Sequence, residues 1–236
     1  NITNLAPYAD KYKVRTILEN KNYQLYINDL LLVVEDPEQI NFDKLPKSFV
    51  MKPNHGSGMI KIVKDKNQTN RNNIKKLANK WLKTKYNDSV GGAEFHYDAI
   101  EPKVIFEKLL ENKDGSPLLD YKFFCFDGKV EFINLVNNSK GIPLMYIFDK
   151  NWNQLPFGLY NKYLKGNFQK PGKLEEMVHI AEELSKDFDF VRIDLYLIDH
   201  EKIVFGEYTF TPGAGMSRFN PKKYDYIYGK KFKVNI

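Results

Sequence analysis

Two acids and an arginine stand on a segment that the sequence predicts to be one β-hairpin. Residues 191–198 alternate between aliphatic and other side chains, and residues 203–209 are again β-branched and aromatic. Only four residues separate the two runs, so a turn centred on residues 200–201 joins them. The residues expected to face each other across the hairpin, all on one face of it, are Arg192 and Thr209, Asp194 and Glu207, Tyr196 and Phe205, and Ile198 and Ile203.

The expected pairing of Asp194 with Glu207 places like charges opposite each other. Opposed residues of an antiparallel pair hold their Cβ atoms about 4.5–5.5 Å apart, so two carboxylates there repel unless a cation lies between them. Mg²⁺ suits such a pair, because it takes oxygen ligands and completes its shell with water and phosphate oxygens. The hairpin therefore predicts a magnesium site; the alternative is an exposed face whose acids pair with unrelated lysines.

A glycine-rich tip joins two further predicted strands, at residues 49–52 and 59–64. It is not a Walker A loop, because no Gly-Lys-Ser/Thr follows at that spacing, and the chain has no GxGxxG between a strand and a helix. Backbone N–H groups of such a tip can still turn toward phosphate oxygens, and Lys52 on the preceding strand would add a positive charge. The alternative is a tip that only turns the chain. The candidate residues are Lys52, His55, Gly56, Ser57 and Gly58.

A third candidate segment is the apolar strand end at residues 106–110, in which a charged pair is embedded. The backbone there can offer one N–H and one C=O to an adenine edge, and Asp120 could accept a hydrogen bond from ribose hydroxyls. The segment also fits an ordinary edge strand. The candidate adenine-binding residues are Glu107, Lys108, Leu109 and Leu110.

The bulk composition is that of a folded protein. The 236 residues are 42% hydrophobic and 14% aromatic, enough for one large domain or two small lobes. A net charge of +6 and a pI near 9.0 favour an anionic partner, but the basic residues are spread along the chain, so nucleic acid is not the expected partner. The lone Cys125 excludes an intrachain disulfide, and no apolar run is long enough for a membrane span; a cytoplasmic protein is expected. Because the chain opens at Asn1, a segment preceding it is also expected.

Hydrophobic periodicity and turn residues predict an α+β chain with hairpins rather than regular βαβ units. The predicted helices are residues 9–21, 72–86 and 174–184. Besides the hairpin, the predicted strands lie within residues 23–34 and at 49–52, 59–64, 103–110, 119–126, 130–136 and 146–148.

Several motifs, in this order, resemble the ATP-grasp superfamily, including the D-alanine:D-alanine ligases with their Arg-Ile-Asp and Glu-x-Asn-x-x-Pro-Gly elements. The closer resemblance is to the TupA-like branch, the polysaccharide-biosynthesis ATP-grasp proteins related to teichuronopeptide synthesis, and it runs from about Ala9 to about Asn220. The motifs that carry it are Asp10-Lys11 within residues 9–15, residues 49–58, Glu107-Lys108-Leu109-Leu110, residues 120–128, Arg192-Ile193-Asp194 and residues 205–213.

The resemblance implies the ATP-grasp fold, with two α+β lobes whose antiparallel sheets enclose the nucleotide. The expected lobes are about residues 40–105 and 106–220, with the helix at 9–21 packing on the second. The roles that the resemblance implies are ATP phosphates for Lys11, Lys52 and the loop at His55, Gly56, Ser57 and Gly58; adenine for Glu107, Lys108, Leu109 and Leu110; ribose for Asp120; Mg²⁺ for Asp194 and Glu207; and the reacting carboxylate for Arg192 and Gly213. Thr209 stands where many family members have a metal-binding Asn.

The activity implied by the resemblance is ligation of a carboxylate to an amine, dependent on ATP and Mg²⁺, through an acyl phosphate. The expected substrate is a uronic acid of a capsular or cell-wall polysaccharide, or its precursor. Two alternatives stay open. A glycosyltransferase would use the short Asp-x-Asp pattern at Asp187-Phe188-Asp189, although aspartates there also suit a turn. A non-catalytic ATP-binding protein is the other.

Overall fold

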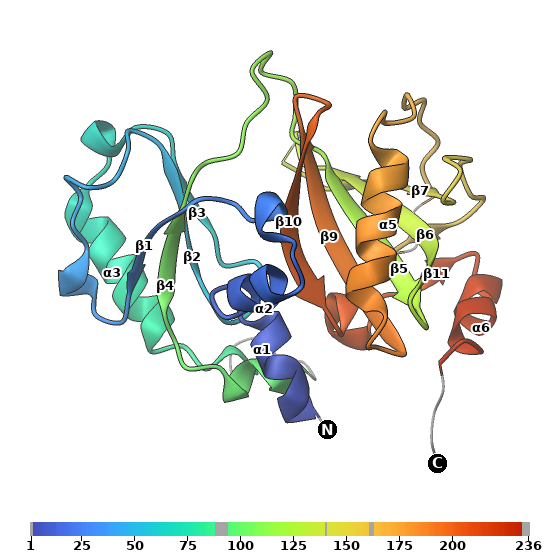
Figure 1. The fold of residues 1–236 in the computed structure, drawn as a ribbon, viewed down its shortest axis with the longest axis horizontal. Helices are drawn as coiled ribbons and strands as arrows, with labels where there is room; N and C mark the ends of the chain where they lie inside the picture. Colours follow the sequence, from blue (N-terminus) through green and yellow to red (C-terminus); the bar gives the residue numbers. More distant parts are fainter. Residues whose placement is uncertain (1, 88–93, 140, 161–162, 233–236) are drawn as a thin grey trace. The chain divides into compact units, whose positions relative to one another are not determined.

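The computed structural model describes residues 2–87, 94–139, 141–160 and 163–232, and Figure 1 shows their elements. The chain divides into two compact units, Asn1–Leu110 and Glu111–Ile236. This division differs from the expected ranges, because the N-terminal segment belongs to the first unit instead of the second lobe. Its Lys11 N–H donates to the Asn54 carbonyl at 3.0 Å, which ties it to the residue that follows strand β2 (Phe49–Pro53) of that unit.

The first unit is built on a four-stranded antiparallel sheet. Helix α3 (Arg71–Leu82) buries Ile74, Ala78 and Trp81, three or four residues apart on one stripe, in a core that includes Phe49 and Phe106 of the sheet. Asn70 caps the helix, since its side chain accepts from the Asn73 N–H. In spatial order the strands are β1 (Leu30–Val34), β4 (Val104–Glu107), β2 (Phe49–Pro53) and β3 (Lys61–Val63).

The helix expected at residues 9–21 is interrupted. The structure has α1 (Ala6–Ala9) and α2 (Val14–Asn20) instead. Between them, the Asp10 carboxylate accepts hydrogen bonds from the backbone N–H groups of Tyr12 and Lys13 at 2.8 and 3.1 Å. Aspartate competes in this way with the helical pattern, so the chain turns at Asp10.

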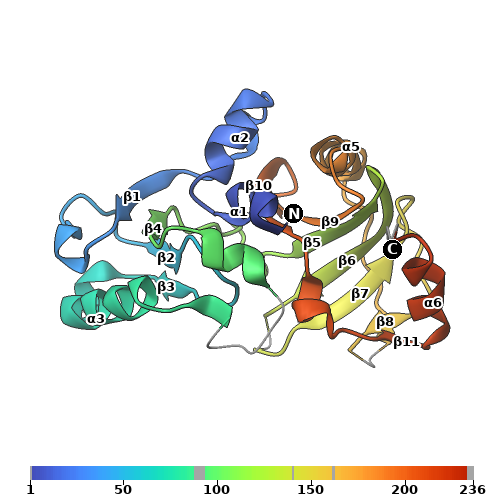
Figure 2. The ribbon, with the colours of Figure 1, turned by 90° about the horizontal axis from the view of Figure 1, so that it is seen from below.

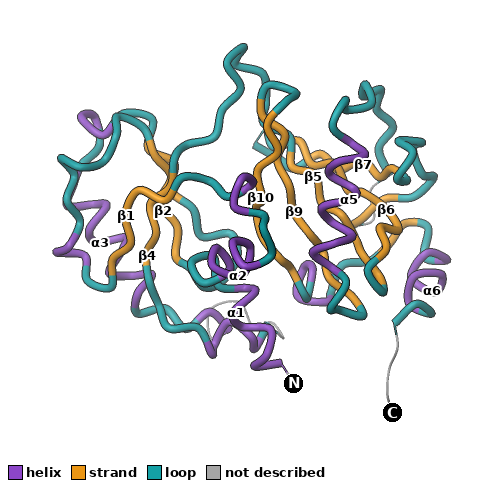
Figure 3. Tube along the Cα trace, in the orientation of Figure 1, coloured by secondary structure: helices purple, strands orange, loops and turns teal. Residues whose placement is uncertain are grey.

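The second unit holds a five-stranded antiparallel sheet, one face of which is covered by helix α5 (Leu174–Ser185) (Figures 1 and 3). The apolar stripe of α5, including Met177, Ile180 and Leu184, is buried, as are Ile193 and Leu195 of the sheet. In spatial order the strands are β10 (Lys202–Thr209), β9 (Phe190–Ile198), β5 (Asp120–Phe126), β6 (Lys129–Asn137) and β7 (Leu144–Phe148).

The short strands β8 (Gly158–Leu159) and β11 (Phe219–Asn220) pair on the other side of this sheet (Figure 2). With α6 (Lys223–Gly229) they bury an aromatic cluster that includes Phe124, Phe132 and Phe157. The chain also has six 3-10 helices, at Ile2–Leu5, Gln24–Tyr26, Pro37–Gln39, Lys66–Gln68, Phe95–Ala99 and Pro212–Gly215, among the described residues. None of the helices in the described ranges has the length and hydropathy needed to cross a bilayer.

Candidate active site

The hairpin of β9 and β10 has the expected register only at the end that carries the opposed acids. Asp194 lies opposite Glu207, and Arg192 lies opposite Thr209, as predicted. Beyond Gly206 the register shifts by one residue. Gly206 is the extra residue of a β-bulge, which the alternating pattern could not reveal. The two other expected pairs are therefore wrong: the structure pairs Tyr196 with Val204 and Ile198 with Lys202.

Two cations relieve the repulsion between the opposed acids. Arg192 Nε lies 2.6 Å from Asp194 Oδ1, and Arg192 Nη2 lies 2.6 Å from Asp194 Oδ2 and 3.5 Å from Glu207 Oε1. The Asp194 side chain is only 2% exposed, so this fork of hydrogen bonds compensates a buried charge. Burial alone would lower the pKa of Arg192, but Asp194 raises it above its ordinary value.

The second cation is Lys122, which the sequence reasoning missed. Lys122 lies opposite Asp194 on the neighbouring strand β5, with its Nζ 2.5 Å from Asp194 Oδ2 and 2.6 Å from Asp120 Oδ2. Alternate residues of a strand point to one face, so the Asp-x-Lys spacing at 120–122 was the available signal. Despite its burial, Asp194 and Asp120 raise the pKa of Lys122.

Asp120 is buried beside this lysine. Burial raises the pKa of Asp120 to about 6, and the nearby Lys122 opposes that shift. Its Oδ1 atom is buried without a hydrogen-bond partner in the described part of the chain. Such an unpaired acceptor is costly, and in a native protein it often marks the place of an absent ion, water or ligand.

A polar row crosses four strands of this sheet. The register places Glu207, Asp194, Lys122 and Asn134 side by side, on β10, β9, β5 and β6. Asn134 is 3% exposed, and its Oδ1 also has no partner among the described residues. The row thus holds acids and cations at one end and an unpaired amide oxygen at the other.

The loop after β10 requires glycine at residue 213. Gly213 has a φ of +60°, and a Cβ there would lie 2.1 Å from Ser217 Oγ. The backbone at Gly213 therefore lies close to the side chains of Ser217 and Tyr160. Thr209, at the end of β10, accepts from Arg192 Nη2 at 2.9 Å and lies 3.3 Å from Glu207 Oε1, so its hydroxyl is engaged within the acid cluster.

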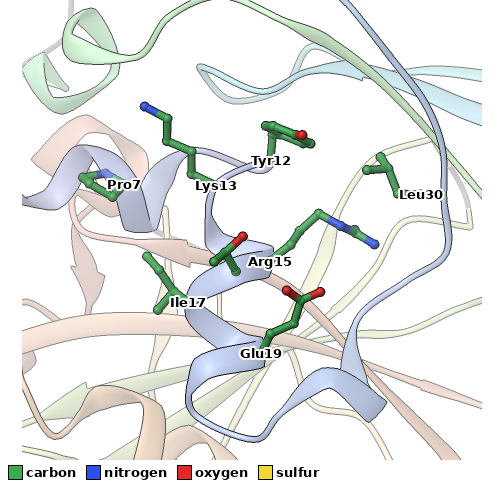
Figure 4. A pocket seen from close by; sticks show the side chains of 8 residues that line it. Pro7, Tyr12, Lys13, Arg15, Ile17, Glu19 and Leu30 are labelled. Atoms are coloured by element: carbon green, nitrogen blue, oxygen red, sulfur yellow. The ribbon is translucent and has the colours of Figure 1, made fainter.

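In the first unit, Glu107 lies between two cations. Lys52 Nζ on β2 is 2.7 Å from Glu107 Oε2, and Arg15 Nη1 on α2 is 3.2 Å from Glu107 Oε1. Arg15 also donates to the carbonyl of Asn28. Figure 4 shows Arg15 reaching from α2 toward Leu30, along a pocket of about 510 Å³. Burial lowers the pKa of Arg15, and Glu107 opposes that shift. The sequence reasoning did not select Arg15.

The glycine-rich tip is fixed at its start. The Asn54 side chain donates to Asp10 Oδ1 at 3.0 Å and accepts from the Lys103 N–H at 2.7 Å. His55 is buried, with its Nε2 3.1 Å from the Thr84 carbonyl, so its ring is turned inward. Lys11 Nζ donates to the Gly56 carbonyl at 2.6 Å. The exposed part of the tip is Ser57 and Gly58.

The segment expected to meet adenine follows β4, which ends at Glu107. The Lys108 N–H donates to the Asp29 carbonyl at 3.0 Å, and the Lys108 carbonyl accepts from Asn28 Nδ2 at 2.9 Å. These bonds engage Lys108 with the residues before β1. Leu109 and Leu110, both half-buried, are the other candidates in this segment.

Comparison with known proteins identifies the fold. A family model described as TupA-like ATPgrasp matches residues 1–233. The chain belongs to the TupA-like ATP-grasp family. Two solved structures resemble this ATP-grasp chain: a D-alanine–D-alanine ligase from Bacillus anthracis complexed with ATP (TM-score 0.50, 20% identity) and an L-amino acid ligase from Bacillus licheniformis (TM-score 0.51, 16% identity). They support the same fold.

The two structural matches cover most of this chain but only about half of each ligase. They include 86% and 87% of the TupA-like chain, against 54% and 44% of the two ligases, so it spans about half their length. A sequence search of curated proteins gives no match. The family match does not support the glycosyltransferase alternative, and Asp187 and Asp189 are exposed residues of the connection between α5 and β9.

The residues of the TupA-like chain fit a magnesium ion. No group of three or more His, Cys, Asp or Glu suited to a metal occurs within the described ranges. The opposed Asp194 and Glu207 nevertheless offer the hard oxygen ligands that Mg²⁺ prefers. Mg²⁺ usually takes few protein ligands and keeps water and phosphate oxygens, so two carboxylates are enough.

Proposed function

We propose that this chain is the ATP-grasp part of an ATP- and Mg²⁺-dependent ligase that joins a carboxylate to an amine. The observation that carries the proposal is the Asp194–Glu207 pair held by Arg192 and Lys122. Acids and cations at one place suit a reaction in which phosphate oxygens, a metal ion and a carboxylate meet. Membership of the TupA-like ATP-grasp family supports the same chemistry.

In the first unit, cationic side chains would bind the ATP phosphates. Lys52 would exchange its partner Glu107 for phosphate oxygens, and Lys11 would act from beside the glycine-rich tip. In that tip, Ser57 and Gly58 are exposed and would offer backbone N–H groups, whereas His55 would anchor the tip. The adenine would contact the Glu107 side chain and the backbone of Leu109 and Leu110. The backbone of Lys108 is already hydrogen-bonded to residues 28–29 and is therefore left out of this set.

In the second unit, Asp194 and Glu207 would hold Mg²⁺, and Asp120 would accept from the ribose. When bound, Mg²⁺ supplies positive charge that neutralises phosphate oxygens. Lys122 would add charge beside Asp194. Arg192 and the Gly213 N–H would stabilise the reacting carboxylate, and Thr209 would orient Arg192 through its 2.9 Å hydrogen bond rather than serve as a third metal ligand.

The reaction has two steps. A carboxylate oxygen attacks the γ-phosphorus, the bond to the β-phosphate oxygen breaks, and an acyl phosphate and ADP form. An amine nitrogen then attacks the acyl carbon, phosphate leaves with the bonding electrons, and the amine loses a proton to solvent. No protein nucleophile is needed, so the residues contribute by positioning and by electrostatic stabilisation.

The carboxylate substrate that we propose is a uronic acid of a capsular or wall polysaccharide, or its precursor. A chain with a net charge of +6 and a pI near 9.0 attracts an anionic saccharide. Cys125 is a buried free thiol, which is compatible with the reducing conditions of the cytoplasm. The enzyme would bind polysaccharide precursors there.

Replacing the buried carboxylate of Asp194 tests the ligase. The experiment measures ADP release from Mg-ATP in the presence of uronic acids and amines. We expect Asp194→Asn to lower turnover at least 100-fold, because it weakens metal binding and removes the buried anion that Arg192 and Lys122 both contact. The matched control is Asp189→Asn, an exposed aspartate just before β9, which should keep wild-type turnover.

Two results would contradict the assignment. Wild-type turnover in Asp194→Asn would remove Asp194 from the metal site. Binding of Mg-ATP by the wild type with no ADP release under any pairing of carboxylate and amine would favour a non-catalytic ATP-binding protein instead. Circular dichroism of both variants would show whether the fold is kept.

A further inference from the structure

A cavity of about 620 Å³ in the second unit is not used by any step above. It lies at strand β7 and the short strand β8, and its lining residues include Ile142, Met145, Leu159, Tyr160 and Leu164; none of the described lining residues is charged. Ile142 is 62% exposed and Tyr160 49% exposed, so the cavity has an open mouth. Its volume and apolar lining are those of a small-molecule site.

One wall of the cavity touches the Thr-Pro-Gly loop. A Cβ at Gly213 would lie 2.7 Å from the hydroxyl of Tyr160, so the phenol lies directly against the glycine. The Tyr160 N–H donates to the Arg218 carbonyl at 3.0 Å, and Leu159 pairs with Phe219. The cavity wall at Leu159 and Tyr160 is therefore bonded to residues 218–219, which follow Gly213 in the chain. We place the reacting carboxylate at Gly213.

The cavity also shares a sheet face with the polar row. Met145 lies opposite Val136, which lies opposite Asp120, so Met145 and Asp120 are two strands apart on the same face. Neighbouring strands are about 4.8 Å apart, which puts the two residues roughly 10 Å from each other. Asn134, with its unpaired buried Oδ1, stands on the strand between them.

We propose that this cavity binds the apolar substituent of the amine substrate. The inference rests on the proposed ligase function. A carboxylate would be held by Arg192, whereas the described lining residues of the cavity are all uncharged and so suit a hydrocarbon group. The amine nitrogen needs hydrogen-bond acceptors, and the Oδ1 of Asn134 is an acceptor without a donor. The preferred amines therefore carry an aliphatic or aromatic group.

The test uses small amines as probes, observed by saturation-transfer NMR on the whole chain. The apolar probes are 2-phenylethylamine and 3-methylbutylamine, and the polar probes are ethanolamine and 1,4-diaminobutane, each with and without Mg²⁺ and a non-hydrolysable ATP analogue. We expect the apolar pair to bind at least ten-fold more tightly than the polar pair in one of these conditions. Equal binding of the two pairs, or none in either condition, would overturn the inference.

A matched pair of variants locates the binding. Ile142→Gln makes the cavity mouth polar at an exposed position, so the fold should be kept, and we expect it to weaken binding of the apolar amines at least five-fold. The control is Ile227→Gln on α6, a residue 47% exposed in the same unit and not in the cavity lining, which should change binding less than two-fold. Wild-type binding in Ile142→Gln would overturn the assignment.

Other occupants of the cavity give different results. Sedimentation of the wild type, but not of Ile142→Gln, with phosphatidylglycerol vesicles would assign the mouth to a membrane surface, and dimerisation lost in Ile142→Gln would assign it to a second copy. Either outcome would overturn the inference. Failure of this inference can be told apart from failure of the proposed ligase function. ADP release that is equally fast with polar and apolar amines would keep the ligase function and remove the cavity as the amine site. Binding of apolar amines without ADP release would keep the cavity as an amine site and remove the ligase function.

Discussion

At the scale of residues, the acid pair of the hairpin is compensated by protein cations. The cluster of Asp120, Lys122, Arg192, Asp194 and Glu207 has three acids and two cations, so one negative charge is in excess when all are ionised. A bound Mg²⁺ would reverse that excess and favour phosphate. The two cations offset the repulsion between the opposed acids.

Asp120 should make stability depend on pH in an identifiable way. Its pKa rises from 3.8 to about 6 on folding, so between these values the folded state binds more protons than the unfolded state. The free energy of unfolding contributed by this group therefore falls as pH rises from about 4 to 6, by an amount on the order of 3 kcal/mol. Asp120→Asn stays neutral and should lose this dependence.

The measurement is urea unfolding of the wild type and of Asp120→Asn, without Mg²⁺, between pH 4 and pH 7. We expect the variant to gain stability relative to the wild type as pH rises. A constant difference would show that the Asp120 carboxyl titrates alike in the folded and unfolded states.

At the scale of elements, the β-bulge of β10 and the glycine-rich tip after β2 decide what each half of the site presents. Gly206 lets Glu207 return to the face of Asp194, since a Cβ at residue 206 would lie 3.0 Å from the Asp194 carbonyl. In the tip, Gly56 has a φ of +82° and Gly58 a φ of +73°. A Cβ at Gly56 would lie 2.3 Å from Tyr86 Cδ2, whereas one at Gly58 would meet nothing within 4 Å.

The two tip glycines provide a matched pair of alanine variants. Gly56→Ala and Gly58→Ala share the backbone strain of a positive φ, so their difference reports the collision with the side chains of Tyr86 and Met59. We expect Gly56→Ala to be less stable than Gly58→Ala by about 1–3 kcal/mol, the usual cost of overpacking. Chemical unfolding measures both. Equal stabilities would show that these two side chains move aside freely.

At the scale of the whole molecule, the functional residues are divided between two compact units. Lys11, Lys52 and Glu107 belong to the first, whereas Asp120, Asp194 and Glu207 belong to the second. Nucleotide binding should therefore be visible in the stability of the whole chain.

Mg-ATP should stabilise the chain against heat. A ligand at 100 times its Kd adds about 2.7 kcal/mol, which corresponds to a Tm increase of roughly 5–10 °C for a protein of this size. Lys52→Ala should lose most of this increase, because it removes a proposed phosphate contact. Lys76→Ala, an exposed lysine of α3, is the control and should keep it. Differential scanning fluorimetry measures all three proteins; an undiminished increase in Lys52→Ala would move the phosphate site elsewhere.

The sequence by itself determined most of the strands and the main candidates. Alternating side chains fixed the strands, and charged residues within those strands marked Asp194, Glu207 and Arg192, because period and residue type are local properties. Only the tertiary structure decided which residues contact one another. The bulge at Gly206, the turn of His55 into the interior and the place of Lys122 between two acids depend on which strands are neighbours. Contacts between residues far apart in sequence leave no local pattern, so the contact of Lys122 with Asp194 on the neighbouring strand was visible only in the folded chain.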